Sequence, residues 1–153
     1  HVAGGDLKLS GEVGIKHVGD LPDTYMGRRY GRADVFGADA SAYTPACTGN
    51  ATQCADEGFV TPFSWGYRLR LEDKFVNAMP GLDLVPSLTW AHDVQGYSND
   101  QVFSEGRKIA IAAISGTIRN TYTFNVFYDD ISGGTYNVLR DRSFYGATVG
   151  LKF

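Results

Sequence analysis

The sequence lacks a long apolar run and an excess of basic residues. No stretch of the 153 residues approaches the roughly 20 apolar residues that a membrane-spanning helix needs. The longest candidate, residues 109–118, is broken by Ser115 and Gly116. The formal net charge of -3 supplies no positive field to hold nucleic acid. We therefore expect neither a helical membrane anchor nor a nucleic-acid partner.

Motifs of catalysis and metal binding are missing as well. No nucleophile elbow, P-loop or zinc-ligand spacing occurs, and only three histidines are present. His92 beside Asp93 could act as a base held by a carboxylate, but a polar pair at a strand end is the favoured interpretation. Asp129 and Asp130 lack the ligand spacing of a calcium loop. We expect no enzymatic activity, no cofactor and no bound metal.

Cysteine is scarce, with Cys47 and Cys54 as the only pair, in a polar stretch. This spacing predicts a local disulfide in an oxidising compartment, and two free thiols are the alternative. Closing so short a loop would contribute roughly 2.5 kcal/mol, which can order a loop but cannot hold a fold.

Glycine and aromatic residues are abundant, with 19 Gly, 9 Tyr and 9 Phe, and this composition favours strands over helices. Apolar and polar residues alternate with period two in six segments, which predicts an all-β fold of six strands. The predicted strands are residues 7–17, 65–73, 82–92, 106–118, 122–129 and 143–153.

Two of these segments interrupt the alternation. Pro86 has no N–H for a strand ladder, so we expect a bulge or another irregularity there. Between residues 106 and 118 the apolar positions change phase after Ile111 and resume at Ile114. This change predicts a bulge near Ala112 and Ala113.

The connections between the predicted strands alternate in length. Residues 74–81 and 119–121 are short, residues 94–105 and 131–142 are long, and residues 18–64 form a very long loop. A soluble sandwich also alternates apolar and polar residues, but this pattern of connections is typical of an antiparallel, up-and-down transmembrane β-barrel. Its long loops, including 18–64, would then be extracellular.

Six strands are too few to close a membrane barrel, because the smallest known examples have about eight. We therefore expect residues 1–153 to be the C-terminal part of a larger barrel. A further hairpin within the long loop and an assembly of several chains are the alternatives.

Charged and aromatic residues separate onto different faces of the predicted strands. Residues expected to face a polar lumen are Lys8, Glu12, Lys16, Arg68, Arg70, Glu72 and Asp83. Residues expected to form the aromatic girdles of a membrane barrel are Trp65, Tyr67, Trp90, Tyr122, Tyr128, Tyr145 and Phe153. The charged ladder either biases a pore or braces the wall, and the solvated face of a soluble sheet would also carry such residues.

Several ordered blocks resemble the C-terminal region of the domain-of-unknown-function 1302 (DUF1302) family: GYRLRLE, PSLTWAHDVQGYS, EGRK, NTYTF, GGTYNVLRDRSF and the terminal KF. The upstream GRADVFG and GFVTPFSWGYR resemble it too. The resemblance implies a longer bacterial outer-membrane protein that moves lipid-like molecules. It also implies a periplasmic lipid-carrier-like protein and a resistance-nodulation-division-type exporter as partners. The last strand, with Phe153 at its end, resembles the signal that the barrel-assembly machinery reads.

The leading functional hypothesis from the sequence is an outer-membrane channel or conduit for hydrophobic or amphipathic small molecules, embedded in the lipid bilayer. The alternative is a structural or surface-interaction barrel whose long loops bind a partner. Loop aromatics such as Phe59, Tyr97, Phe103 and Tyr136 fit either hypothesis.

Overall fold

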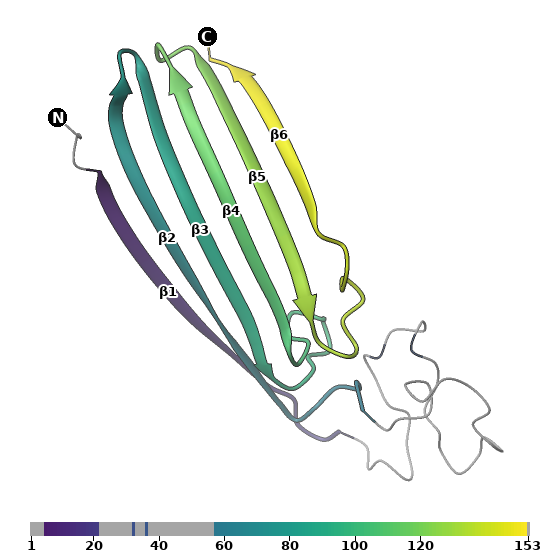
Figure 1. Ribbon diagram of the computed structural model, residues 1–153. Coiled ribbons are helices and arrows are strands. Elements are labelled where there is room, and N and C mark those ends of the chain that lie inside the picture. The colour runs from purple at the N-terminus through teal and green to yellow at the C-terminus, as the bar shows by residue number, and fades with distance from the viewer. Residues whose placement is uncertain (1–4, 22–31, 33–35, 37–56, 153) are drawn as a thin grey trace.

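The computed structural model describes residues 5–21, 32, 36 and 57–152, which build a single antiparallel sheet (Figure 1). Its strands are β1 (Asp6–His17), β2 (Phe63–Met79), β3 (Leu82–Gln95), β4 (Arg107–Ile118), β5 (Tyr122–Gly133) and β6 (Phe144–Leu151). Each strand pairs with its neighbours in chain order, so the sheet is an up-and-down meander. The six predicted strands are confirmed. In this part of the chain, no helix is long and apolar enough to cross a membrane.

Tight turns join the strands at one end of the sheet. Strand β2 continues to Met79, so the connection predicted for residues 74–81 shortens to a two-residue turn that contains Gly81 at a φ of 76°. Between β4 and β5, Arg119 and Asn120 have φ values of 49° and 58°. Two positive φ angles in succession are typical of hairpin turns that follow the right-handed twist of the strands.

Long connections lie at the opposite end. Residues 96–106 join β3 to β4 and residues 134–143 join β5 to β6. The buried positions of the described chain gather mostly at this end and include Ser64, Ser98 and Tyr136. The sheet itself is one layer thick, so most packing in the molecule occurs where the loops fold together.

The register corrects one prediction about β4. Pairing of β4 with both neighbours is continuous, from Ile111 opposite Thr89 and Asp129 to Ile114 opposite Pro86 and Val126. The predicted bulge near residues 112–113 is therefore wrong. Because side chains alternate along a regular strand, Ile109 and Ile111 lie on the face opposite to Ile114. The change of phase in the sequence reflects a change in which face is apolar.

Pro86 does interrupt pairing, as expected from its missing N–H. The β2–β3 ladder passes from Glu72–Ser87 to Phe75–Leu84 without a change of register, and Pro86 lies in this gap. A register shift follows between Phe75 and Met79. The bulged strand contains Asn77 at a φ of 52°.

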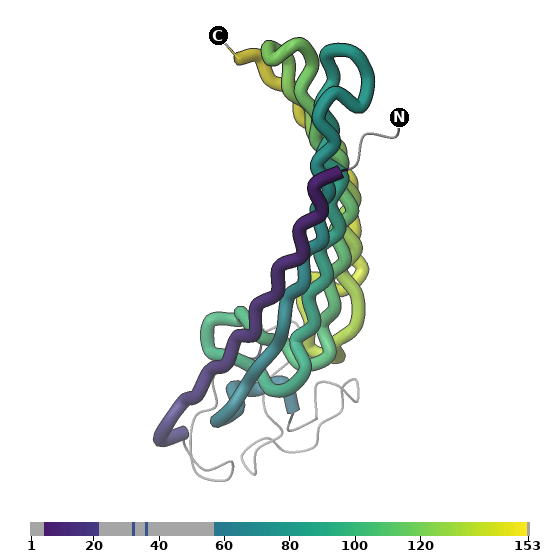
Figure 2. The backbone as a smooth tube through the Cα atoms, turned by 90° about the vertical axis from the view of Figure 1, so that its left-hand side faces the viewer, coloured from purple at the N-terminus to yellow at the C-terminus, as the bar shows by residue number. Residues whose placement is uncertain are grey.

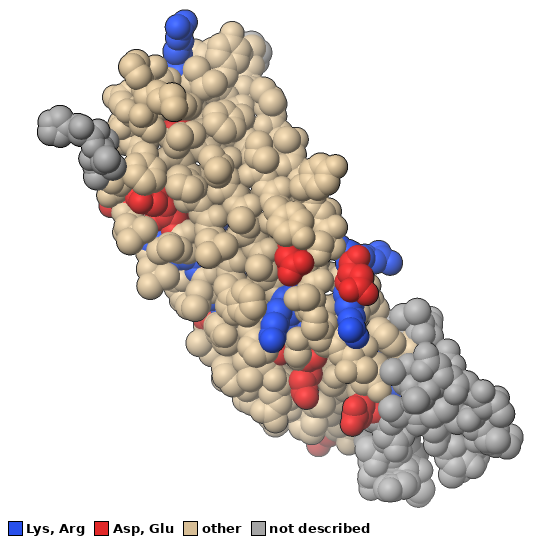
Figure 3. All heavy atoms as spheres, viewed as in Figure 1, with Lys and Arg blue, Asp and Glu red and all other residues tan. Residues whose placement is uncertain are grey.

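The sheet is bowed along its length, and Figure 2 shows the loop of residues 96–106 on its concave side. The convex face carries large apolar residues that remain exposed, such as Leu9 (71%), Ile15 (72%) and Val149 (85%). Figure 3 shows this face, where most of the visible charged side chains lie toward the long loops. At the edges, β1 pairs only with β2 and β6 only with β5 among the described strands, so the sheet is not closed.

Aromatic rings cover glycines on neighbouring strands. A Cβ atom added at Gly116 would come within 2.4 Å of the Phe124 ring and 3.2 Å of the Asp83 carbonyl oxygen. A Cβ atom at Gly146 would come within 2.5 Å of the Phe127 ring. Each glycine therefore leaves the space in which a ring packs against the sheet.

We expect Gly116→Val to lower the free energy of unfolding by about 2 kcal/mol, because overpacking displaces the Phe124 ring. Ala112→Val on the same strand and face is the matched control. Ala112 lines an open groove of about 620 Å³, which has room for two more methyl groups. Urea unfolding of the full-length protein in detergent measures both effects, and equal losses would contradict the packing argument.

Candidate functional site on the concave face

The register brings together the charged residues that were predicted to share a face. Lys8, Glu12 and Lys16 of β1 lie opposite Glu72, Arg68 and Ser64 of β2, respectively. All these side chains belong to the concave face, because that face also receives the loop of residues 96–106. Their position relative to a lumen stays a prediction, since the sheet is open.

Several members of this set have specific partners. Arg70 donates to Glu72 Oε2 through Nη2 at 2.9 Å and through Nε at 3.2 Å. Asp83 does not lie beside Glu72, whose partner across the hairpin is Ser87. It instead accepts a hydrogen bond from the Asn77 backbone N–H at 2.7 Å, near the tight turn. Asp83 therefore stabilises the bulge in β2 rather than extending the charged ladder.

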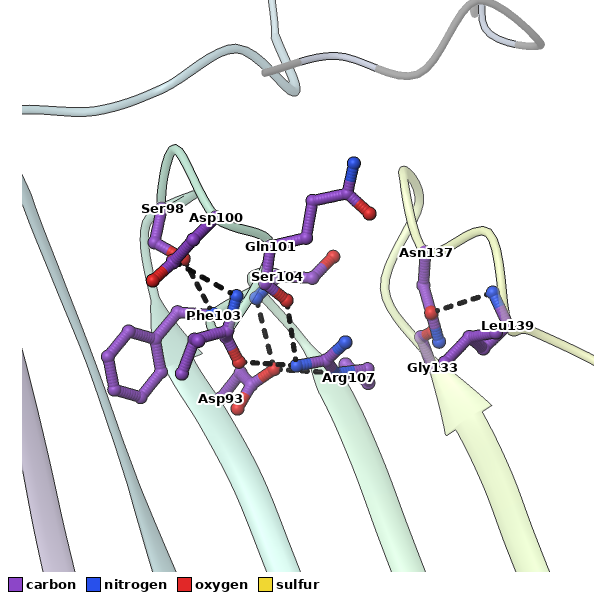
Figure 4. A network of polar contacts seen from close by, with 11 residues as sticks. Asp93, Ser98, Asp100, Gln101, Phe103, Ser104, Arg107, Gly133, Asn137 and Leu139 are labelled. Atoms are coloured by element: carbon purple, nitrogen blue, oxygen red, sulfur yellow. Dashed lines mark hydrogen bonds and ion pairs between the residues drawn. The ribbon is translucent and has the colours of Figure 1, made fainter.

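The loop of residues 96–106, here called the concave loop, is anchored by a nearly buried ion pair (Figure 4). Arg107 Nε lies 2.7 Å from Asp93 Oδ2, and the two side chains are 12% and 10% exposed. The same carboxylate oxygen accepts from the Ser104 backbone N–H at 3.0 Å. Arg107 also donates to the Val102 carbonyl oxygen. One ion pair thus holds both ends of the loop, because Asp93 lies two residues before the end of β3 and Arg107 begins β4.

The tip of the concave loop reaches β1 and β2. The Phe103 ring lies over Gly14 and Gly66, whose added Cβ atoms would come within 2.9 Å and 3.2 Å of it. Lys16 forms an ion pair with Asp100. The loop therefore spans the concave face from the β3–β4 hairpin to the β1 edge.

Electrostatics match this contact at the loop tip. The hydrogen bond from Lys16, followed by one from Ser98, lowers the pKa of Asp100 from its ordinary value of 3.8 to about 2. The Asp100 carboxylate also accepts from the Val102 backbone N–H at 3.3 Å. Charged Asp100 is therefore the form that the folded loop favours.

Aromatic side chains pack together where the loops meet. Tyr136 contacts Phe36 and Tyr97 edge-on, with centroid distances of 5.3 and 5.9 Å. The Arg32 guanidinium lies over the Phe59 ring at 4.4 Å. Burial, and next the charge of Glu105, raises the pKa of Tyr97 to about 12. These loop aromatics stabilise the loop assembly, and Tyr136 is only 7% exposed.

The concave face is not polar throughout. On β4, β5 and β6 it carries large apolar side chains, namely Ile109, Ile111, Phe127, Ile131 and Phe144. This patch was not predicted from the sequence, because the change of phase after Ile111 was interpreted as a bulge. Strict alternation through residues 107–118 is the signal that identifies it.

The predicted aromatic girdle lies on the convex face. Trp90 donates to the Tyr67 hydroxyl at 3.3 Å near the long-loop end, and His92 contacts Tyr67 edge-on. Tyr122 begins β5 at the tight-turn end. Tyr128 and Tyr145 lie in the same register row as Leu71. Trp65 pairs with Ile15 at the loop end.

Some predicted features lie outside the described residues, and others are not supported by the geometry. Cys47, Cys54 and Phe153 fall outside the described residues. His92 and Asp93 point to opposite faces as neighbours on a strand, and Asp93 is bound to Arg107. Within residues 5–21, 32, 36 and 57–152, no group of three His, Cys, Asp or Glu residues is placed to hold a metal ion.

The ordered motifs of the chain and its six-stranded sheet can now be compared with known proteins. The model of a family described as "Protein of unknown function (DUF1302)" matches residues 4–153. The chain belongs to the DUF1302 family. This match confirms the resemblance inferred from the motifs, over nearly the whole chain. No curated protein and no solved structure matches it.

We expect Asp93→Ala to cost about 3 kcal/mol and to release the concave loop, because Arg107 would stay nearly buried without its partner. Arg70→Ala is the control, since its pair with Glu72 is 54% and 33% exposed and should contribute less than about 1 kcal/mol. Urea unfolding and amide hydrogen exchange across residues 96–106 measure the two effects. Equal protection of the loop in Asp93→Ala and the native protein would show that the ion pair does not anchor it.

The Lys16–Asp100 contact should respond to acid. Because the folded pKa of Asp100 is below 3.8, its contribution is complete above about pH 4 and is lost as the pH falls toward 2. A nitroxide label at Val102→Cys should become more mobile over this range. In Asp100→Asn the label should be mobile already at pH 5 and should change little between pH 5 and pH 2. An unchanged spectrum in the native background between pH 5 and pH 2 would contradict this account.

Proposed function

We propose that this chain forms part of the wall of a bacterial outer-membrane β-barrel, and that the barrel is a passive conduit for hydrophobic or amphipathic small molecules. The observation that carries this proposal is the separation of residues between the two faces of one sheet. The convex face exposes large apolar side chains, whereas the concave face carries all the charged residues of β1 and β2 except Asp73. Lipid would cover the first face and a polar interior would receive the second.

Three further features support a barrel wall. Tight turns gather at one end of the sheet and long loops at the other, as periplasmic turns and extracellular loops do in such barrels. The unpaired edges of β1 and β6 offer backbone groups that further strands would have to pair within a membrane. The Trp90 and Tyr67 pair has the amphipathic character of residues at a membrane interface.

The concave loop suits a conduit better than a surface receptor. Phe103 and Asp100 reach across the concave face, where they would narrow a barrel interior. The aromatic loop residues that could have contacted an external partner pack against each other instead. Under this proposal, the barrel-assembly machinery would insert the protein, and a periplasmic lipid carrier and an exporter would be its partners.

We expect the full-length protein in liposomes to release a small amphipathic dye, and Phe103→Ala to increase both dye release and single-channel conductance severalfold by widening the constriction. Val102→Ala is the control, since Val102 is 42% exposed at the same loop tip. Absence of both dye release and conductance in the properly folded native protein would reject the conduit. Equal effects of the two substitutions would reject Phe103 as the constriction.

A further inference from the structure

The apolar patch of the concave face surrounds one carboxylate. Asp129 of β5 lies between Ile111 of β4 and Phe144 of β6 in the register. Phe127 and Ile131 precede and follow it on the same face of β5. The Phe127 and Phe144 rings meet edge-on with centroids 5.8 Å apart. Aliphatic and aromatic side chains therefore flank Asp129 on every side within the sheet.

Among the described residues, none provides a hydrogen bond to the Oδ1 atom of Asp129. This atom is also shielded from solvent. A carboxylate oxygen in apolar surroundings is costly unless a cation or a donor satisfies it. The adjacent Asp130 differs, because it points to the other face and accepts from Ser143 Oγ at 2.9 Å.

Two described arginines on the same face, Arg70 and Arg107, are too far away and already engaged. Arg70 lies three strands from Asp129 in one register row, about 14 Å away at ordinary strand spacing. It is bound to Glu72. Arg107 begins β4 four residues before Ile111, about 13 Å along the strand, and is bound to Asp93. Neither guanidinium can neutralise Asp129.

An apolar patch with one unsatisfied polar group has the composition of a small-molecule site, in which a few polar atoms orient an apolar ligand. We propose that Asp129, Ile111, Phe127 and Phe144 form a binding subsite for a cationic amphiphile. The ammonium group of this ligand pairs with Asp129, and its alkyl chain packs on the two rings and on Ile111. The negative charge selects an amine over a carboxylate of the same chain length.

The position of this subsite links it to the conduit, and the assignment rests on the proposed function. Its register row, which contains Ser10 of β1, lies four residues from Gly14, where Phe103 of the concave loop is seated. The row is displaced from the loop toward the tight turns. A molecule that passes the concave loop would therefore meet the subsite next, with the charged strip of β1 and β2 across from it.

Octylammonium is a suitable probe, with octanol and octanoate as its uncharged and anionic matches. We expect the full-length protein, purified in non-ionic detergent, to bind octylammonium at least tenfold more tightly than octanol by calorimetry, and to bind octanoate least. Asp129→Asn should weaken octylammonium binding at least tenfold, because a charge-assisted hydrogen bond is lost. Asp130→Asn should leave it within twofold of the native value.

Phe144→Ala provides a second variant if Asp129→Asn fails to assemble, since Phe144 begins β6 and is 49% exposed. It should weaken octylammonium and octanol binding alike, by several fold. Equal binding of the three probes, or equal losses in Asp129→Asn and Asp130→Asn, would overturn the subsite.

Dye release from liposomes separates the two proposals. Release without selective octylammonium binding would leave the conduit and reject the subsite. Selective octylammonium binding without dye release would support the subsite and reject the conduit.

Discussion

An apolar face spread over one layer of strands must be covered by something other than this sheet. Side chains such as Leu9 and Val149 on the convex face are largely exposed, and fully burying each would contribute about 2 kcal/mol. No second layer packs on them within the described residues. All charged residues of β1 and β2 except Asp73 lie on the other face, and the bowed sheet turns the apolar face outward. A hydrocarbon environment around the convex face would satisfy this constraint without a second layer of protein.

Local order in the molecule comes from a different source. At the loop end, the Asp93–Arg107 pair and the backbone donors around it replace an apolar core with a connected polar network. Such a network is rigid only when all its members are satisfied, because a charge left without its partner is costly. It fixes the β3–β4 connection, and Phe103 then reaches Gly14 on β1. The side chain of Asp93, which belongs to the sheet, thereby positions the loop that covers part of the concave face.

Period-two alternation predicted all six strands and the tight connections. The pleat of a strand sends successive side chains to opposite faces, so a strand leaves a direct signal in the sequence. The same rule was misapplied after Ile111, where a change in which face is apolar was interpreted as a bulge. Contacts between distant residues, such as Arg107 with Asp93 and Phe103 with Gly66, leave no local periodic signal. Glycines within predicted strands were the available signal, since a glycine in a strand often marks a close approach. The site therefore required the three-dimensional register, whereas the fold class did not.

The asymmetry of the concave face follows from the same constraint. The convex face is the one that has to be covered, so the residues of the concave face need not be uniformly polar or uniformly apolar. On the concave face, the charged side chains of β1 and β2 lie in the same register rows as an apolar strip on β4 to β6. A purely structural interior would gain little from Ile111 and Phe144 beside an unpartnered Asp129, because apolar burial and a satisfied carboxylate exclude each other there. A ligand with an alkyl chain and a cationic group removes that conflict, since one molecule meets both requirements.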